Sequence, residues 1–335
     1  MTNTRHIAWA ILVCAAIGRP ALAQDFGLPT RLPAQEAIPT ETPPYDAAFP
    51  GSRAAYDAFP SFVPPAPHIA SSRPAWLPPA DNQPWSWQLL PDGLIYHAYL
   101  AGVKESRLSS TWVHERDRGW QWESTLGGRA GLIRFGTQND FYPEGFQLDV
   151  EGSGQVRLDF QNARDVDSVD FRVGAPLTWR QGRWEGKFGF YHLSSHAGDE
   201  FLLKNPNFKR INFTRDVLVL AAAYRPTPAL RLYTEAGWAF QSDVSEPWEF
   251  QFGIDYAPFN PTGFWGAPFA AVNGHLRQEV NFGGNVVVQA GWAWRGAGAG
   301  HLLRAGFEYF NGKSRQFEFF NQSEEQIGMG IWYDY

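Results

Sequence analysis

The sequence has almost no cysteine, and its single Cys14 lies in a short apolar run near the start. That run, Ile7 to Ile17, follows Arg5 and precedes the small-residue sequence Ala21-Leu22-Ala23. A basic start, a short apolar run and such a cleavage site are typical of a secretory signal peptide, so we expect residues 1–23 to be removed on export. The mature chain would then contain no cysteine, which excludes disulfides as a source of its stability.

A long apolar segment and a basic cluster are also missing. After the leader, the longest apolar run extends only from Val217 to Ala223, far short of the ~20 residues of a transmembrane helix. The formal net charge is −6, with no basic stripe, so we expect no nucleic-acid partner. A membrane location stays open, because the strands of a membrane β-barrel alternate in polarity and average out to a polar composition.

Proline is concentrated in one region. Residues 24–91 hold 15 of the 25 prolines, and such a segment forms neither a helix nor a sheet ladder, so we expect it to be extended and semi-rigid. It contains a weak repeat, Tyr45 to Pro50 against Tyr56 to Pro60. The repeat is either a docking motif for a periplasmic partner or a coincidence of biased composition.

From about Leu94 to Tyr335 the chain is rich in aromatic residues and alternates between apolar and polar positions. One example is Trp248, Phe250 and Phe252, interleaved with Glu249 and Gln251. This period of two is typical of strands with one apolar and one polar face. We count about a dozen strands of roughly ten residues, the length that crosses a bilayer at a tilt. Residues 92–335 are therefore predicted to form an all-β domain, an antiparallel up-and-down transmembrane barrel.

The chemistry of the two faces favours a barrel in an outer membrane over a soluble β-domain. The polar faces are strongly charged, and the apolar faces end in Trp and Tyr, as in an interfacial girdle. The last residues resemble the C-terminal strand signal of outer-membrane barrels, which has apolar residues two apart before a terminal aromatic residue: Ile327, Met329, Ile331, Tyr333 and Tyr335. We expect membrane lipid to contact the apolar face, and a soluble domain would instead enclose it.

The polar face would line the lumen. It includes Arg157, Asp159, Arg231, Glu235, Arg304 and Glu308. These residues could line a pore, but a barrel of about 12 strands has little spare width, which favours an interior filled by ion pairs.

The direction of the strands depends on one loop. If Asn311 to Glu325 form a single outer loop, Gln181-Gly182 and Pro226 to Pro228 lie at the periplasmic end and His192 lies near the outer surface. A separate strand at Ser314 to Phe320 would reverse this assignment.

One strand carries a candidate catalytic pair. Trp184, Phe188 and Phe190 share a phase that His192 and Ser194 continue, so both polar residues are predicted to face lipid. The arrangement resembles the His-x-Ser pair of the outer-membrane phospholipase A and lipid A deacylase families. That resemblance implies His192 as general base and Ser194 as nucleophile, because a serine hydroxyl needs a neighbouring imidazole to take its proton.

A third residue on the next strand would orient the imidazole, and Asp216 or Asn212 could supply it. No cofactor is expected, although calcium is possible if the protein is a hydrolase. The sequence lacks the Asn-Gly that often follows the serine in those families, and polar residues at a membrane rim are also expected without any catalytic role. A third interpretation is a zinc or calcium site formed by His192 with His196, Asp199 and Glu200.

Over Trp85 to Tyr335 the chain also resembles a bacterial family of exported β-proteins designated DUF1207. The resemblance rests on Tyr191 to Phe201, Arg225 to Pro228, Glu246 to Phe250, Gly274 to Arg277, Gly300 to Arg304 and Ile331 to Tyr335. It implies no activity. Three hypotheses therefore remain: an outer-membrane barrel with a structural, binding or narrow-pore role, a lipid acyl hydrolase, and a secreted soluble β-domain that binds a glycan or a protein.

Overall fold

The computed structural model describes residues 84–138, 142–296 and 300–335. The predicted signal peptide and nearly all of the proline-rich segment lie outside these ranges. Thirteen strands are present: β1 Ser86–Leu89, β2 Leu108–Glu115, β3 Gly119–Gly136, β4 Gly145–Asp159, β5 Asp165–Gln181, β6 Trp184–Ala197, β7 Thr214–Tyr224, β8 Leu230–Ser242, β9 Trp248–Tyr256, β10 Ala267–Arg277, β11 Gly283–Arg295, β12 Leu302–Lys313 and β13 Ser323–Asp334. The short helices are α2 Asp199–Lys204, η1 Gln278–Val280 and η2 Phe317–Phe319.

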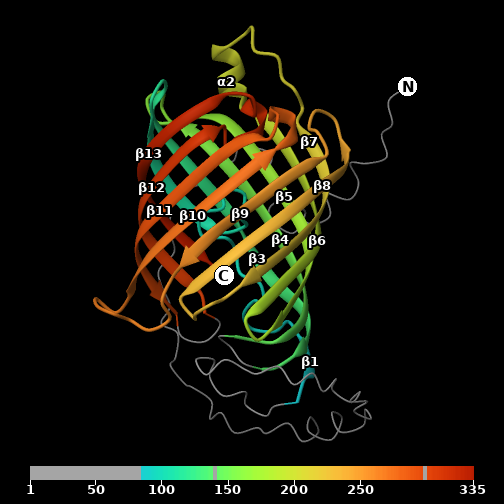
Figure 1. Ribbon diagram of the computed structural model, residues 1–335. Helices are drawn as coiled ribbons and strands as arrows, with labels where there is room; N and C mark the ends of the chain where they lie inside the picture. Colours follow the sequence, from blue (N-terminus) through green and yellow to red (C-terminus); the bar gives the residue numbers. More distant parts are fainter. Residues whose placement is uncertain (1–83, 139–141, 297–299) are drawn as a thin grey trace, which may run out of the picture. The chain divides into compact units, whose positions relative to one another are not determined.

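Strands β2 to β13 form a closed antiparallel barrel of 12 strands (Figure 1). Strands that follow each other in sequence lie side by side, and β2 closes the ring by pairing with β13, where Leu108 lies opposite Tyr333. Strand β1 pairs only with the end of β3. The predicted all-β, up-and-down barrel is confirmed. No described helix is long and apolar enough to cross a membrane.

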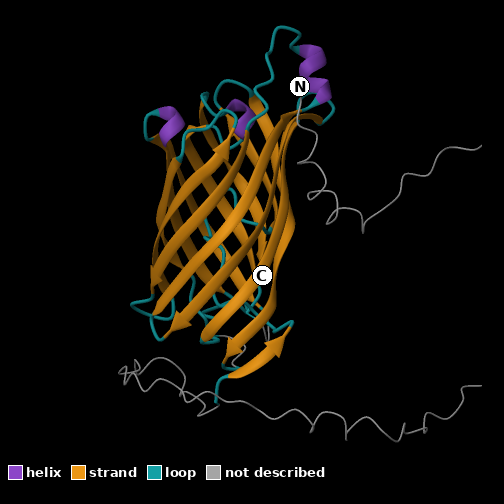
Figure 2. Ribbon diagram, turned by 90° about the vertical axis from the view of Figure 1, so that its right-hand side faces the viewer, coloured by secondary structure: helices purple, strands orange, loops and turns teal. Residues whose placement is uncertain are grey.

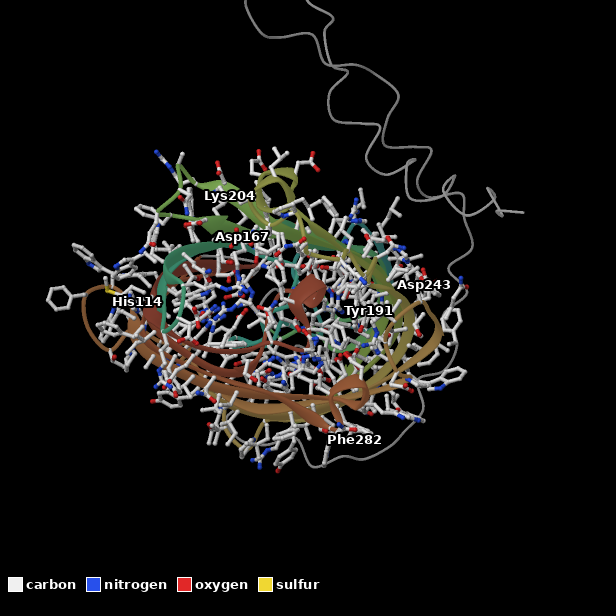
Figure 3. All side chains as sticks on the ribbon, turned by 90° about the horizontal axis from the view of Figure 1, so that it is seen from above. His114, Asp167, Tyr191, Lys204, Asp243 and Phe282 are labelled. Atoms are coloured by element: carbon white, nitrogen blue, oxygen red, sulfur yellow. The ribbon has the colours of Figure 1, made fainter. Side chains whose placement is uncertain are left out.

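Most barrel strands have an apolar outer face and a largely polar inner face; β7 is an exception, because Val217, Val219, Ala221 and Ala223 are buried on its inner face. On β6, Phe188 and Phe190 are exposed on the outer wall, whereas Glu185 and Lys187 point inward and are buried. Viewed along the barrel (Figure 3), Tyr191 lies inside the ring of strands, and Phe282 lies at its edge. The interior is therefore the charged side, which is the opposite of the apolar interior that the soluble alternative requires.

The two ends of the barrel differ. Gly182, in the left-handed region at φ 59°, makes the tight turn between β5 and β6, and the turn at Pro226 to Pro228 lies at the same end. Helices α2 and η2 lie at the opposite end (Figure 1). Residues 314–322 form a loop around η2 and no strand, so the single-loop assignment is the one that the structure supports.

The segment before β2 does not form a strand. Residues 94–107, here called the luminal segment, run through the inside of the barrel (Figure 2), and 11 of these 14 residues are buried. The period-two pattern was expected to begin at about Leu94, but the first barrel strand begins at Leu108. The apolar side chains between them are buried by the barrel interior and not by lipid.

The luminal segment is held by side chains from several strands. The Arg231 guanidinium of β8 donates to the His97 carbonyl at 3.0 Å, and Asp255 of β9 accepts from the Leu100 amide at 3.2 Å. The Tyr99 ring stacks on Tyr233 with centroids 3.9 Å apart. These partners lie on the neighbouring strands β8 and β9, so they anchor the segment to this part of the wall.

Much of the rest of the lumen is filled by ion pairs, with small apolar clusters between them. Arg157 contacts Glu123 and Glu324, each at 2.6 Å, and Arg304 contacts Asp334 at 2.8 Å. Three cavities in the lumen measure only about 50, 30 and 10 Å³. This agrees with the packed interior expected from the charged faces.

Candidate functional site

The candidate catalytic pair lies on the outer wall of β6, close to the end that carries α2. His192 and Ser194 are half-buried and continue the outward phase of Phe188 and Phe190, whereas Leu193 between them is buried in the lumen. Both polar side chains therefore lie on the outer face of the barrel, as the alternation along the strand predicted. Strand β6 ends at Ala197, so the pair is only a few residues from the rim of the barrel.

Asp216 of β7 lies directly opposite His192 in the β6–β7 register. Its Oδ1 is 2.7 Å from His192 Nδ1, and the side chains are 24% and 35% exposed. A carboxylate that accepts from Nδ1–H holds the imidazole in the tautomer whose Nε2 can take a proton. Asn212, the other candidate for this role, is exposed in the loop before β7.

Ser194 lies on the same outer face, opposite Thr214 of β7. Two residues of a strand span about 6.6 Å, so His192 and Ser194 are neighbours along the wall. Within the described residues no hydrogen bond joins the Ser194 hydroxyl to His192. In serine hydrolases such hydrogen bonds are often long without substrate and shorten when it binds.

The inner side of the same strand is firmly held. The Ser195 hydroxyl donates to Asp170 and accepts from the Glu318 amide at 2.7 Å. Lys104 of the luminal segment forms an ion pair with the same Asp170. These contacts fix the backbone directly behind Ser194, which leaves its outward side chain on a rigid support.

The residues of the metal hypothesis are not brought together. The His196 ring lies outward near Phe171, with centroids 6.2 Å apart, and Asp199 and Glu200 are exposed in the first turn of α2. The described part of the chain contains no group of three or more His, Cys, Asp or Glu residues that could hold a metal ion.

Sequence reasoning missed the residues that fill one end of the lumen. Arg225, Arg231 and Arg295 surround a cavity there together with His97 of the luminal segment. Arg231 had been assigned to the lumen by its phase. Arg225 and Arg295 stand at strand ends, where the alternation breaks off and gives no signal.

Comparison with known protein families identifies the family of this chain. The family model described as "Protein of unknown function (DUF1207)" matches residues 53–335. The chain belongs to this DUF1207 family. No curated protein matches the DUF1207 chain.

Several solved barrels are similar to the DUF1207 chain. Outer membrane phospholipase A from Escherichia coli is 10% identical, with a TM-score of 0.46, over 68% of this chain and 92% of that one. The KdgM porin in complex with disordered oligogalacturonate is 12% identical, with a TM-score of 0.38, over 68% and 99%. The NanC porin is 10% identical, with a TM-score of 0.38, over 67% and 98%. Similarity at this level carries no information about activity.

Proposed function

We propose that this protein is an outer-membrane barrel that hydrolyses acyl esters of membrane lipids on its outer wall. Ser194 is the nucleophile, His192 the general base and Asp216 the residue that orients the imidazole. The observation that carries the proposal is the 2.7 Å contact between His192 Nδ1 and Asp216 Oδ1, on the outer face two residues before Ser194. The same three roles operate in serine hydrolases of unrelated folds.

The outer wall has the chemistry of a lipid-facing surface. Exposed apolar side chains occupy its middle, and aromatic residues stand where strands begin and end, as in the girdles of membrane barrels. Near the turns these include Trp184, Tyr256 and Trp294, and near the helices Trp120, Trp238, Trp248 and Tyr309. This pattern supports an outer-membrane location.

The position of the site suits an ester at the membrane interface. Polar residues are costly at the centre of a bilayer and tolerated near its surface, and Ser194 is three residues from the end of β6. The ester bonds of a phospholipid lie at this depth, between the acyl chains and the headgroup. A lipid could therefore present its ester to Ser194 without leaving the membrane.

The reaction would proceed in two steps. His192 Nε2 takes the Ser194 proton as Oγ attacks the ester carbonyl, and the alcohol leaves with that proton. Water, activated by the same imidazole, then releases the fatty acid and restores the serine. The Asp216 carboxylate stabilises the imidazolium formed in each step.

The test compares acyl release from micellar phospholipid by the detergent-extracted protein and its Ser194→Ala variant, with calcium and with chelator. Migration on unboiled gels verifies that each barrel is folded. His196→Ala is the matched control, because its side chain lies on the same outer face two residues further on. Loss of release in Ser194→Ala alone supports the proposal. An equal rate in Ser194→Ala and wild type ends it, as does absence of release by the folded wild-type protein.

A further inference from the structure

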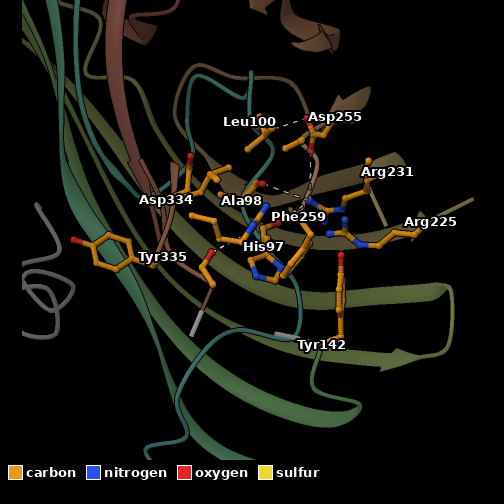
Figure 4. Close-up of a pocket in the computed structure, with 15 residues that line it drawn as sticks. His97, Ala98, Leu100, Tyr142, Arg225, Arg231, Asp255, Phe259, Asp334 and Tyr335 are labelled. Atoms are coloured by element: carbon orange, nitrogen blue, oxygen red, sulfur yellow. Dashed lines mark hydrogen bonds and ion pairs between the residues drawn. The ribbon is translucent and has the colours of Figure 1, made fainter. Parts of the chain in front are cut away.

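A second site lies inside the barrel, at the end opposite α2 and away from Ser194. A cavity of about 50 Å³ is enclosed there by the luminal segment and by residues at the ends of β7 and β11. Figure 4 shows Arg225 and Arg231 side by side on its wall, with His97 and Tyr142 nearby. The hydrolytic proposal makes no use of this cavity.

Positive charge around the cavity exceeds the negative charge available to neutralise it. The Glu185 carboxylate alone is shared by Arg225 at 2.5 Å, Arg231 at 3.1 Å and Arg180 at 3.8 Å. Each of these arginines is mostly or fully buried. One carboxylate can balance one guanidinium, so this group retains positive charge in a place where water is scarce.

Arg295 adds a further positive charge that has no carboxylate partner among the described residues. Its guanidinium donates to the Gly300 carbonyl at 2.9 Å and lies over the Phe259 ring at 4.1 Å. It forms no ion pair with any described residue. In the same cavity wall, Arg231 Nη2 and His97 Nδ1 are buried and have no hydrogen-bond partner in the described part of the chain.

The two acids in the cavity wall, Asp255 and Asp334, are already engaged by groups other than Arg295. Asp255 accepts from the Leu100 amide and lies 3.6 Å from Arg231. Asp334 pairs with Arg304 at 2.8 Å and with Arg107 at 3.0 Å. Neither carboxylate contacts Arg295, so the surplus of positive charge faces the cavity itself.

We infer that this cavity binds a small oxyanion of the phosphate class. Guanidinium groups present paired donors that match the oxygens of phosphate, and the buried Nη2 donor of Arg231 would gain an acceptor. A cavity of about 50 Å³ has room for a single group of this size. The inference is independent of catalysis at Ser194 and holds whether or not the protein is a hydrolase.

The test is calorimetric titration of the purified full chain in a neutral detergent and phosphate-free buffer, with inorganic phosphate as the probe. Arg295→Gln is the informative variant, because removing a side chain without an ion pair leaves no carboxylate unpaired. We expect its affinity for phosphate to fall roughly tenfold or more. Arg116→Gln is the control, since Arg116 is exposed and pairs with Glu325 at the other end of the barrel.

Two further titrations define the ligand. Acetate should bind much more weakly than phosphate, and equal binding of both would overturn the assignment to the phosphate class. Lysophosphatidic acid in the micelle competes with phosphate if the site takes lipid headgroups, and fails to compete if it takes the free ion. Absence of saturable phosphate binding by the wild-type chain, or unchanged affinity in a folded Arg295→Gln variant, would overturn the inference.

Discussion

Asp216 of β7 is directly opposite His192 of β6 in the strand register, with 2.7 Å between Asp216 Oδ1 and His192 Nδ1. On its other side Asp216 stands at an irregularity, because the β7–β8 register shifts between Asp216 and Val217. Such bulges re-aim side chains and occur near active sites. The irregularity in β7 thus lies at the residue whose carboxylate contacts the His192 imidazole, on a wall that is otherwise apolar.

Replacing the Asp216 carboxylate tests the role that we propose for it, the orientation of the His192 imidazole. Asp216→Asn keeps the size of the side chain but removes its charge, so the imidazole loses both its fixed tautomer and its stabilising anion. We expect fatty-acid release to fall roughly 10²–10⁴-fold, the range that general-base catalysis contributes. Asn212→Ala is the control and should retain the wild-type rate. An Asp216→Asn variant that is as active as wild type would remove Asp216 from the proposed mechanism.

The stability of the folded barrel, with the luminal segment in place, should depend strongly on Lys104. Lys104 is 6% exposed and its partner Asp170 is fully buried. Lys104→Met would leave a buried carboxylate without its cation, and we expect the free energy of unfolding to fall by about 3–5 kcal/mol. Denaturant titration followed by tryptophan fluorescence measures this. Lys204→Met, which breaks the exposed pair with Asp165, should leave the midpoint almost unchanged, and equal effects of both variants would contradict the prediction.

The sequence predicted the wall of the barrel better than its contents. Alternation along β6 and β9 identified the outward faces, because lipid and lumen impose opposite polarity on successive residues. Residues 94–107 escaped this reasoning. Leu94, Ile95 and Tyr96 are apolar in succession, which fits a strand as well as a segment enclosed on all sides, and only the folded barrel shows which environment surrounds them.

The candidate site was predictable for a similar reason, and only in part. Phase alone placed His192 and Ser194 outward, and proximity along the chain suggested a partner on β7. The choice between Asp216 and Asn212 depends on the β6–β7 register, and alternation cannot separate them because their positions differ by an even number. The Arg295 cavity depends on contacts between residues about 200 positions apart, His97 among them, and no local pattern reports these.

Acid should weaken the docking of the luminal segment through His97. Burial of the imidazole, followed by the nearby positive charge of Arg225, holds the pKa of His97 well below its usual value of 6.5. In the unfolded chain His97 therefore takes up a proton near pH 6.5, whereas in the folded chain it stays neutral. The free energy of unfolding is thus highest above this pH and decreases as the pH falls below it. The loss amounts to at most about 1.4 kcal/mol per pH unit for one group.

The measurement compares the free energy of unfolding at pH 7.5, 6.5 and 5.5 for the wild type and His97→Gln. Below pH 6.5 the free energy of unfolding should decrease less steeply with falling pH in the variant, because one titrating group has been removed. His114→Gln, which changes an exposed histidine at the opposite end, serves as the control. Identical slopes in wild type and His97→Gln would show that His97 does not couple folding to pH.

The outer wall offers the most direct test of the membrane location. Phe188 lies in the middle of β6 and is 54% exposed. On a soluble protein Phe188→Arg would be nearly neutral or would improve solubility, because it replaces a water-exposed apolar ring by a charge. On a lipid-facing wall the same change places a guanidinium near the bilayer midplane, at a cost of roughly 2–4 kcal/mol. Folding into phospholipid vesicles, followed by unboiled gel migration at increasing denaturant, separates the two cases. Phe188→Leu should fold like wild type, and a Phe188→Arg variant that is equally stable would place this face in water.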